Sequence, residues 1–350
     1  MTNFDFIHPG FRLDGQSFSG KHDLTEYVSI HYPGHAGFLK DWFSDDKHIR
    51  LQTSGSTGTP EKIVFPKEKL VKSAGRTIRF FDLPPQTKAL LDLPSAFVAG
   101  KMMWIRALTG GWHLTVKNPG EEIGKDEYFD FGAMVPKQIA KNIDRIEQIA
   151  KLLSGGSHPP EMLLQNLKEK RNLIFQTYGM TETLTHIAVM PLTNPAAIFL
   201  KTANPSVYTA LEGVSFAVDE RGCLRIKDRY LDLDLITNDV VELTDGKSFV
   251  WKGRYDNVIN SGGIKIFPEE VERKLSAFIE GRFIVTSVPD DEWGEKTVLA
   301  VEGDAFELDY GIFELAGLKF YEKPKEIRFI KKFPETDSGK VKRNEVKKLL

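Results

Sequence analysis

Between residues 89 and 183 the chain alternates short apolar runs with longer segments of helical spacing, and this alternation constrains the fold more than any other feature. The predicted strands are residues 89–93, 113–116 and 172–176, and the predicted helices are residues 98–108 and 159–170. Strands that alternate with helices favour a parallel sheet with helices on its faces. We therefore expect an α/β fold for this part of the chain.

Four loops rich in small or polar residues follow or adjoin predicted strands, at residues 53–60, 94–100, 154–157 and 177–183. In open α/β sheets, ligands bind beyond the carboxyl ends of the strands. We expect these loops to border one shared crevice.

The remaining segments are less regular. Residues 63–81 favour a strand and a helix, residues 132–149 contain helical patterning, and residues 1–50 show no clear periodicity and are expected to be an irregular covering segment. Beyond residue 205 the expected elements are short strands at 214–218, 223–227 and 248–251, a helix at 268–278, strands at 283–288 and 297–301, and a helix at 306–318.

The composition changes at the glycine-rich stretch 253–265, which marks a domain boundary. We predict a large domain over residues 1–252, a small α+β domain over residues 253–350, and a hinge near residues 254–257. The 350-residue length suits two domains.

Charge and cysteine content exclude several classes of partner. The 47 basic and 49 acidic residues nearly cancel, which argues against nucleic acid or an anionic membrane as the main partner. No apolar run approaches the length of a membrane span, and no signal peptide is apparent. A single cysteine, Cys223, fits a reducing compartment, so a cytoplasmic protein is expected. The oligomeric state cannot be predicted.

Residues 51–62 place small and hydroxylated residues before Pro60 and Lys62. Such a loop can direct several backbone N–H groups and hydroxyl groups toward one anion. Its spacing matches neither the Gly-Lys-Ser/Thr nucleotide loop nor the dinucleotide fingerprint. Taken alone, the run is as typical of a flexible linker as of a phosphate site.

Four further segments accompany this loop: residues 176–183 (Gln-Thr-Tyr-Gly-Met-Thr-Glu-Thr), 237–239 (Thr-Asn-Asp), 253–272, which begins Gly-Arg-Tyr-Asp and contains Ser-Gly-Gly, and 333–343, which contains Ser-Gly-Lys. In this order they resemble the core motifs of the adenylate-forming superfamily of acyl-CoA synthetases, luciferases and peptide-synthetase adenylation domains. The resemblance spans residues 51–343. It implies ATP and Mg²⁺ as cofactors and coenzyme A as co-substrate.

The resemblance assigns roles to individual residues. Glu182 would hold Mg²⁺, Thr181 would contact the α-phosphate, and Lys340 would reach the α-phosphate and the substrate carboxylate. Asp239 and Arg254 would face the ribose, and Tyr178 would stack near the adenine. The remaining cofactor-binding candidates are Thr53, Ser54, Gly55, Ser56, Thr57, Gly58 and Thr59 for the phosphates, Gly155, Gly156 and Gly179 beside the nucleotide, and Gly262 and Gly263 along the pantetheine channel.

A rotation of the small domain separates the two half-reactions in this superfamily, and Asp256 stands at the corresponding hinge position. In the adenylation step Lys340 occupies the crevice. In the thioester step the same space must admit a thiol.

Residues 93–108 are most similar to the compact bacterial o-succinylbenzoate–CoA ligases of menaquinone biosynthesis. This likeness implies a small aromatic carboxylic acid as substrate. Arg106 suits the second carboxylate of a dicarboxylate through bidentate contact, and Phe97 would border the acid site. A helix-surface arginine is an equally acceptable interpretation of Arg106.

The chain departs from the superfamily pattern at three places: Phe97 stands where many members have histidine, Glu61 displaces the lysine after the phosphate loop so that the role of Lys62 is open, and Asn238 replaces a common glycine.

Simpler interpretations also exist for single residues. Glu182 could cap a helix, Asp239 could be a turn residue, and Lys340 could belong to a solvated basic face. Two alternatives stay open: adenylation of another aryl acid with transfer to CoA or to carrier-protein pantetheine, and a catalytically silent nucleotide-binding protein.

Overall fold

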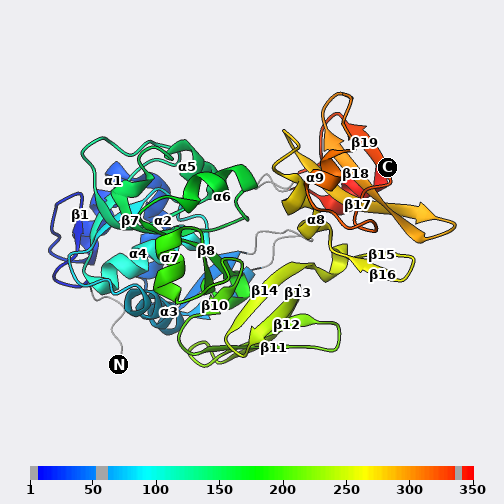
Figure 1. The fold of residues 1–350 in the computed structure, drawn as a ribbon. Helices are drawn as coiled ribbons and strands as arrows, with labels where there is room; N and C mark the ends of the chain where they lie inside the picture. Colours follow the sequence, from blue (N-terminus) through cyan, green and yellow to red (C-terminus); the bar gives the residue numbers. More distant parts are fainter. Residues whose placement is uncertain (1–6, 53–61, 336–340) are drawn as a thin grey trace.

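The computed structural model describes residues 7–52, 62–335 and 341–350, and over these residues twelve strands form one large sheet (Figure 1). Six of these strands run parallel to their neighbours, in the order β1-β5-β4-β6-β7-β8, and six more continue the sheet in antiparallel fashion, in the order β9-β10-β14-β13-β12-β11. The α/β fold class is therefore confirmed. The parallel arrangement expected for the alternating segment is present, but the whole sheet is mixed, because the chain after β8 reverses at a short turn and pairs back on itself.

The strands of the parallel half are β1 (Arg12–Leu13), β5 (His113–Val116), β4 (Lys88–Leu91), β6 (Phe129–Met134), β7 (Ile149–Ser154) and β8 (Leu173–Gly179). Those of the antiparallel half are β9 (His186–Pro191), β10 (Tyr208–Ala210), β14 (Ser248–Arg254), β13 (Leu233–Asp245), β12 (Cys223–Asp228) and β11 (Val214–Val218). The helices that accompany this sheet are α3 (Lys67–Phe80), α4 (Val98–Gly110), α5 (Pro136–Lys141), η1 (Ile146–Gln148), α6 (Glu161–Lys168), η2 (Thr181–Thr183) and α7 (Asn194–Leu200).

Most of the predicted alternation is confirmed. Helix α4, expected over residues 98–108, extends to Gly110, and Gly111 takes the left-handed conformation (φ 71°) that closes a helix. Residues 132–149 were interpreted as helical, and here the prediction is largely wrong. They hold the end of β6, the six-residue α5 and the start of β7. Both strands are buried on both faces, so neither shows the alternation by which strands are recognised.

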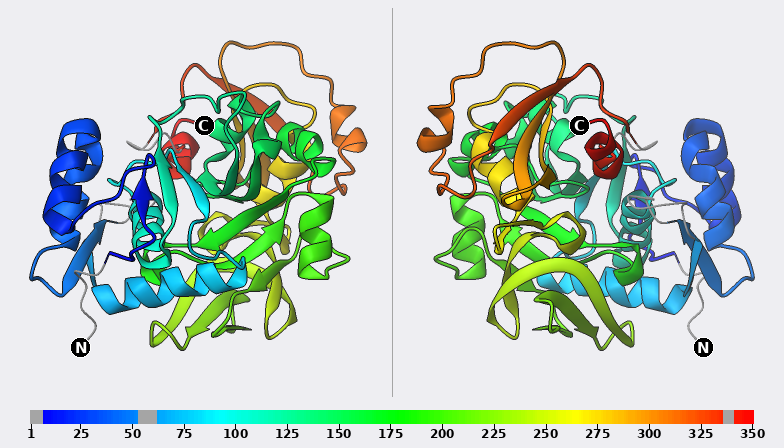
Figure 2. Two further views of the ribbon diagram at one scale, coloured as in Figure 1. Left: turned by 90° about the vertical axis from the view of Figure 1, so that its left-hand side faces the viewer. Right: turned by 90° about the vertical axis from the view of Figure 1, so that its right-hand side faces the viewer.

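The expectation of an irregular N-terminal segment is also wrong. Helices α1 (Lys21–His31) and α2 (Pro33–Trp42) follow one another with only Tyr32 between them. Helix α1 buries only Leu24 and Val28, so it has no long apolar stripe, and Pro33 starts the second helix and restarts the helical period. Strands β2 (His48–Gln52) and β3 (Lys62–Pro66) form a separate antiparallel pair. Figure 2 shows α1 and α2 on the flank of the molecule opposite the orange strands of the C-terminal segment.

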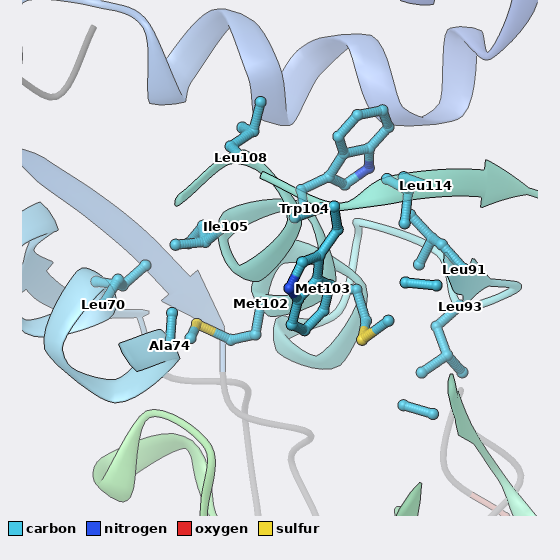
Figure 3. Close-up of a cluster of buried hydrophobic side chains, with 14 of the residues drawn as sticks. Leu70, Ala74, Leu91, Leu93, Met102, Met103, Trp104, Ile105, Leu108 and Leu114 are labelled. Atoms are coloured by element: carbon cyan, nitrogen blue, oxygen red, sulfur yellow. The ribbon is translucent and has the colours of Figure 1, made fainter. Parts of the chain in front are cut away.

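Helix α4 lies inside the largest apolar core. Its residues Met102, Met103, Trp104 and Ile105 are fully buried, and their neighbours come from α3, β4 and β5 (Figure 3). The neighbouring residues drawn there are Leu70, Ala74, Leu91, Leu93 and Leu114. Arg106, in the middle of this helix, is therefore almost completely removed from water.

In the described part of the segment after Arg254, five strands form a second sheet with an apolar core of its own. The elements are η3 (Tyr255–Asn257), β15 (Ile259–Ser261), β16 (Ile264–Ile266), α8 (Pro268–Leu275), β17 (Phe283–Asp290), β18 (Gly294–Glu302), α9 (Ile312–Leu315), β19 (Glu326–Ile330) and α10 (Arg343–Lys348). The helix expected over residues 306–318 is wrong except for the short α9. Asp309 and Gly311 form a turn before it, and Gly317 (φ 65°) ends the segment after it.

Candidate active site

The carboxyl ends of β7 and β8 are joined by hydrogen bonds that bring the loop at residues 154–157 against the Thr177-Tyr178 segment. Thr177 Oγ1 donates to the Ser154 carbonyl at 2.9 Å, and Gln176 Nε2 donates to the Ser157 carbonyl at 3.1 Å. A Cβ on Gly155 would lie 3.3 Å from Thr177 Oγ1, and Gly156 has a φ of 89°. Glycine at both positions thus allows this close approach. The structure places the two predicted glycines beside Tyr178.

Tyr178 and Asp239 are brought together from strands β8 and β13. The Tyr178 hydroxyl donates to Asp239 Oδ2 at 2.7 Å, and Trp251 Nε1 donates to Asp239 Oδ1 at 3.2 Å. Burial, followed by the neighbouring Asp239 carboxylate, raises the pKa of Tyr178 well above its usual value, so the phenol stays protonated. Asp239 is 6% exposed and keeps free lone pairs, because an ionised carboxylate has about four acceptor sites. It is therefore a fixed anion that can accept further hydroxyl groups.

Arg254 lies between two carboxylates. It stands opposite Asp239 in the β13–β14 register, with Nη1 3.9 Å from Asp239 Oδ1 and Nη2 3.1 Å from Asp256 Oδ2. The Asn238 amide donates to the same Asp256 carboxylate at 3.3–3.4 Å. Asp256 lies in η3. This short helix connects β14, the last strand of the large sheet in chain order, to β15, the first strand of the second sheet.

Glu182 lies in η2, the short turn that connects β8 to β9. Thr183 Oγ1 accepts from the Met180 N–H at 2.9 Å, which holds this turn together. Gly179 is required here, because a Cβ would lie 2.4 Å from the Thr185 carbonyl oxygen. Glu182 and Thr181 are half-buried, and the Glu182 carboxylate has no hydrogen-bond or ion-pair partner among the residues described. It is therefore free to bind a cation whose other ligands come from a substrate, as Mg²⁺ bound to phosphates requires.

Arg106 is the most unusual group near this edge of the sheet. It is 2% exposed, in the middle of α4. Its Nη2 donates to Thr185 Oγ1 at 3.2 Å, its Nη1 faces the Met103 sulfur at 3.7 Å, and its Nε has no acceptor among the described residues. Within the part of the chain that the structure describes, no carboxylate contacts it. Burial, with a smaller contribution from Arg76, lowers the pKa of Arg106 to about 9, so it stays charged at neutral pH. The interpretation of Arg106 as a surface residue is wrong.

Two residues beside Arg106, Thr185 and His186, were missed in the sequence. Thr185 Oγ1 lies 3.2 Å from His186 Nδ1, and His186 Nε2 lies 3.4 Å from Thr77 Oγ1 on α3. Burial, followed by Arg106 and Arg76, lowers the pKa of His186 well below its usual value, so the ring is neutral. The sequence feature that could have identified them is their position directly after the Thr-Glu-Thr motif, where a histidine begins an otherwise apolar strand.

The other predicted residues lie apart from this cluster or outside the described residues. Phe97 precedes α4, is 58% exposed, and has no contact with Arg106 among those described. Gly262 and Gly263 form the turn between β15 and β16, where a Cβ on Gly262 would lie 2.7 Å from the Trp293 ring. Lys62 begins β3 and is exposed. The phosphate-loop candidates Thr53 to Thr59 and the catalytic candidate Lys340 lie outside the described residues.

Among the described residues, no three histidine, cysteine or acidic side chains lie close enough together to hold a metal ion by themselves. The search for long apolar helices over the same residues finds none that would cross a membrane.

Comparisons of this chain with family models, curated proteins and solved structures agree on one family. The family model described as "AMP-binding enzyme" matches residues 45–222, just over half of the chain. The chain is 26% identical to a 2-succinylbenzoate–CoA ligase from Listeria monocytogenes over 88% of this chain and 71% of the relative. It is also 24% identical to an indoleacetate–CoA ligase from Aromatoleum aromaticum, over 85% of this chain and 66% of the relative.

Solved structures agree in fold. An acyl-CoA synthetase (AMP-forming)/AMP-acid ligase II-like protein from Dyadobacter fermentans is 32% identical, with a TM-score of 0.61 over 95% of this chain and 99% of the other. The o-succinylbenzoate–CoA synthetase of Bacillus subtilis, solved with ATP and magnesium, is 17% identical, with a TM-score of 0.72 over 94% of this chain and 82% of the other. The chain therefore belongs to the AMP-binding enzyme family, the adenylate-forming enzymes that include the AMP-forming acyl-CoA synthetases.

Proposed function

We propose that this enzyme joins a dicarboxylic aryl acid, o-succinylbenzoate, to coenzyme A through an acyl-adenylate, as a step of menaquinone biosynthesis. The observation that carries the choice of acid is Arg106, a buried cation that no described carboxylate contacts. An ion in such a position is expensive unless a ligand supplies the opposite charge. The coarser activity, AMP-forming ligation of an acid, follows from the family.

In the first half-reaction, a carboxylate oxygen of the acid attacks the α-phosphorus of ATP. The bond from the α-phosphorus to the bridging oxygen breaks, and pyrophosphate leaves. Asp239 would accept hydrogen bonds from the ribose hydroxyls, with Tyr178 and Trp251 holding the carboxylate in place. Arg254 would face the same sugar. These residues position the nucleotide and take no part in bond making.

The charge that develops on the phosphates needs donors and a cation. Bound Mg²⁺ would neutralise part of the phosphate charge. Glu182 would hold it, because this carboxylate is partly exposed and has no protein partner among the residues described. Thr181, the neighbour of Glu182, would contact the α-phosphate. By family resemblance, the loop from Thr53 to Thr59 and Lys340 would supply further donors.

Arg106 would accept the carboxylate that is not activated, which in o-succinylbenzoate is the ring carboxylate. A guanidinium binds a carboxylate through two parallel N–H groups, and Arg106 Nε is a buried donor to which no described residue offers an acceptor. Phe97 would stand at the mouth of the acid site, since it is exposed at the carboxyl end of β4.

In the second half-reaction the thiol of coenzyme A attacks the acyl carbonyl, a C–S bond forms, and the bond to AMP breaks. We propose that the segment after residue 253 is a separate domain that rotates about Asp256 between the two steps. Its own sheet and apolar core support this. The Gly262-Gly263 turn would line the pantetheine channel.

ATP–pyrophosphate exchange with a panel of aryl acids tests the proposal. Exchange is expected with o-succinylbenzoate, followed by a CoA thioester when CoA is added. Exchange without a thioester would favour transfer to carrier-protein pantetheine, and exchange with indoleacetate but not o-succinylbenzoate would move the enzyme to another aryl acid. Absence of exchange with every acid would favour the silent nucleotide-binding protein.

A further inference from the structure

The hydrogen bonds around Arg106 have a definite direction. A guanidinium only donates hydrogen bonds, so Thr185 Oγ1 must be the acceptor from Arg106 Nη2 at 3.2 Å. The hydroxyl proton of Thr185 is therefore available to another acceptor. The nearest ring nitrogen of His186, Nδ1, lies 3.2 Å from the same oxygen.

The tautomer of His186 follows from its other side. Thr77 Oγ1 donates its proton to the Ser73 carbonyl at 3.4 Å, one turn earlier on α3. Its remaining role toward His186 Nε2 at 3.4 Å is that of acceptor, so Nε2 carries the ring proton. Because the buried ring is neutral, Nδ1 has a lone pair and accepts from Thr185. The donor and acceptor roles are therefore consistent along the series of contacts that runs from Thr77 on α3 through His186 and Thr185 to Arg106 on α4.

We infer that Thr185 and His186 are positioning residues that hold the Arg106 guanidinium ready for the second carboxylate of the acid. His186 takes the Thr185 proton, and this turns a Thr185 lone pair toward Arg106. The inference rests on the proposed function of Arg106 and adds the residues that determine its selectivity.

Two other arrangements are less favourable: one in which Thr185 offers Arg106 no acceptor, and one in which His186 is charged. Thr185 is the one oxygen acceptor that contacts the Arg106 guanidinium among the residues described. Without that oxygen, all five N–H donors of a buried cation would lack an oxygen partner. A charged His186 would place a third positive group beside Arg106 and Arg76.

Thr185→Val removes the acceptor at nearly constant volume, and Thr185→Ser keeps it. Kinetics are measured for o-succinylbenzoate and for 4-oxo-4-phenylbutanoate, the analogue that lacks the ring carboxylate. The valine variant should raise KM for o-succinylbenzoate about 10- to 100-fold, the value of a hydrogen bond to a charged group, with a much smaller change in kcat. The KM for the analogue should change far less, and the serine variant should restore selectivity. Thr109→Val, which removes a hydroxyl bonded only within α4, is the matched control and should not change selectivity.

An equal loss on both acids, or no rescue by serine, would overturn the inference and leave Thr185 a structural residue. Arg106→Gln separates this from the proposed function. If Arg106→Gln impairs the reactions of the two acids equally, the proposed function fails. If Arg106→Gln impairs o-succinylbenzoate selectively and Thr185→Val does not, only the present inference fails.

A second measurement needs no variant. Nitrogen chemical shifts of the histidine rings in the ¹⁵N-labelled protein report the tautomer of His186 directly, with His186→Gln serving only to assign the signal. A neutral ring with the proton on Nε2 is expected, and a proton on Nδ1 would contradict the proposed direction of the hydrogen bonds.

Discussion

Replacing Arg106 by methionine should make the free enzyme more stable while removing its preference for a dicarboxylic acid. Methionine fills a similar volume in an apolar core and carries no charge. The side chains around Arg106 on α4 are fully buried, so the charge has no access to water in the free protein. Well-packed apolar replacements of buried ions are often neutral or stabilising.

The size of the expected stabilisation follows from the pKa of Arg106. Burial moves the pKa of Arg106 from 12.5 to about 9, and at about 1.36 kcal/mol per pKa unit the charge costs roughly 5 kcal/mol in this place. The variant also loses the Thr185 hydrogen bond and some packing, together about 2 kcal/mol. A net gain of about 2–3 kcal/mol remains, which for a chain of this length corresponds to roughly 3–4 °C in Tm. Because the folded pKa is the lower one, the penalty is fully present below about pH 9 and is lost only as pH rises above it, so the gain should be constant between pH 6 and 8.

Thermal unfolding of both proteins, with and without o-succinylbenzoate, checks this. The ligand should raise the Tm of the parent enzyme and not that of the variant. Arg76→Met is the matched control, because Arg76 is equally buried but pairs with Asp228 at 2.6 Å. Its loss leaves an unpaired buried carboxylate and should destabilise by about 3–5 kcal/mol. If Arg106→Met lowers the Tm as Arg76→Met does, Arg106 is a satisfied structural residue and the reasoning fails.

Three further predictions concern other residues. Burial raises the pKa of Asp92 to about 7, and neither carboxylate oxygen has a hydrogen-bond partner in the part of the chain that the structure describes. The proton that the folded state retains is lost as pH rises through this pKa, so Asp92→Asn should match the parent near pH 4 and exceed its stability by about 2–4 kcal/mol at pH 8; an equal difference in urea unfolding at both pH values would count against this. Asp239→Asn should raise KM for ATP about 10-fold or more, whereas Tyr178→Phe, which leaves the carboxylate in place, should raise it less; the reverse order would argue against ribose binding by Asp239. Lys340→Ala should slow adenylation by about 10²–10³ and spare thioester formation from supplied acyl-adenylate, and equal losses in both half-reactions would exclude the two-step role.

The sequence predicted the core of the fold well because its signals are local. Strand β4 and helix α4, which Gly111 closes, need only neighbouring residues to be recognised. Strands β6 and β7 were missed for the opposite reason. Most of their residues are buried, and no regular alternation of apolar and polar residues marks them.

The site was predicted residue by residue through family motifs, and its geometry was not. The hydrogen bond from Tyr178 to Asp239 joins residues 61 positions apart, and the contact from Arg106 to Thr185 joins residues 79 apart. Whether Arg106 faced solvent or core could not be decided from its helix alone, because α4 packs against several elements. The roles of His186 and Thr185 depend on these distant contacts and have no motif of their own.

The most direct test is a single-turnover reaction of the enzyme with ATP, Mg²⁺ and o-succinylbenzoate, stopped and analysed by mass spectrometry. The account predicts that o-succinylbenzoyl-adenylate forms first and is converted to the CoA thioester when CoA is added, and that Arg106→Gln forms far less adenylate from this acid than from its monocarboxylate analogue. An enzyme that adenylates the analogue as readily as o-succinylbenzoate would contradict the assignment of Arg106 and of the acid.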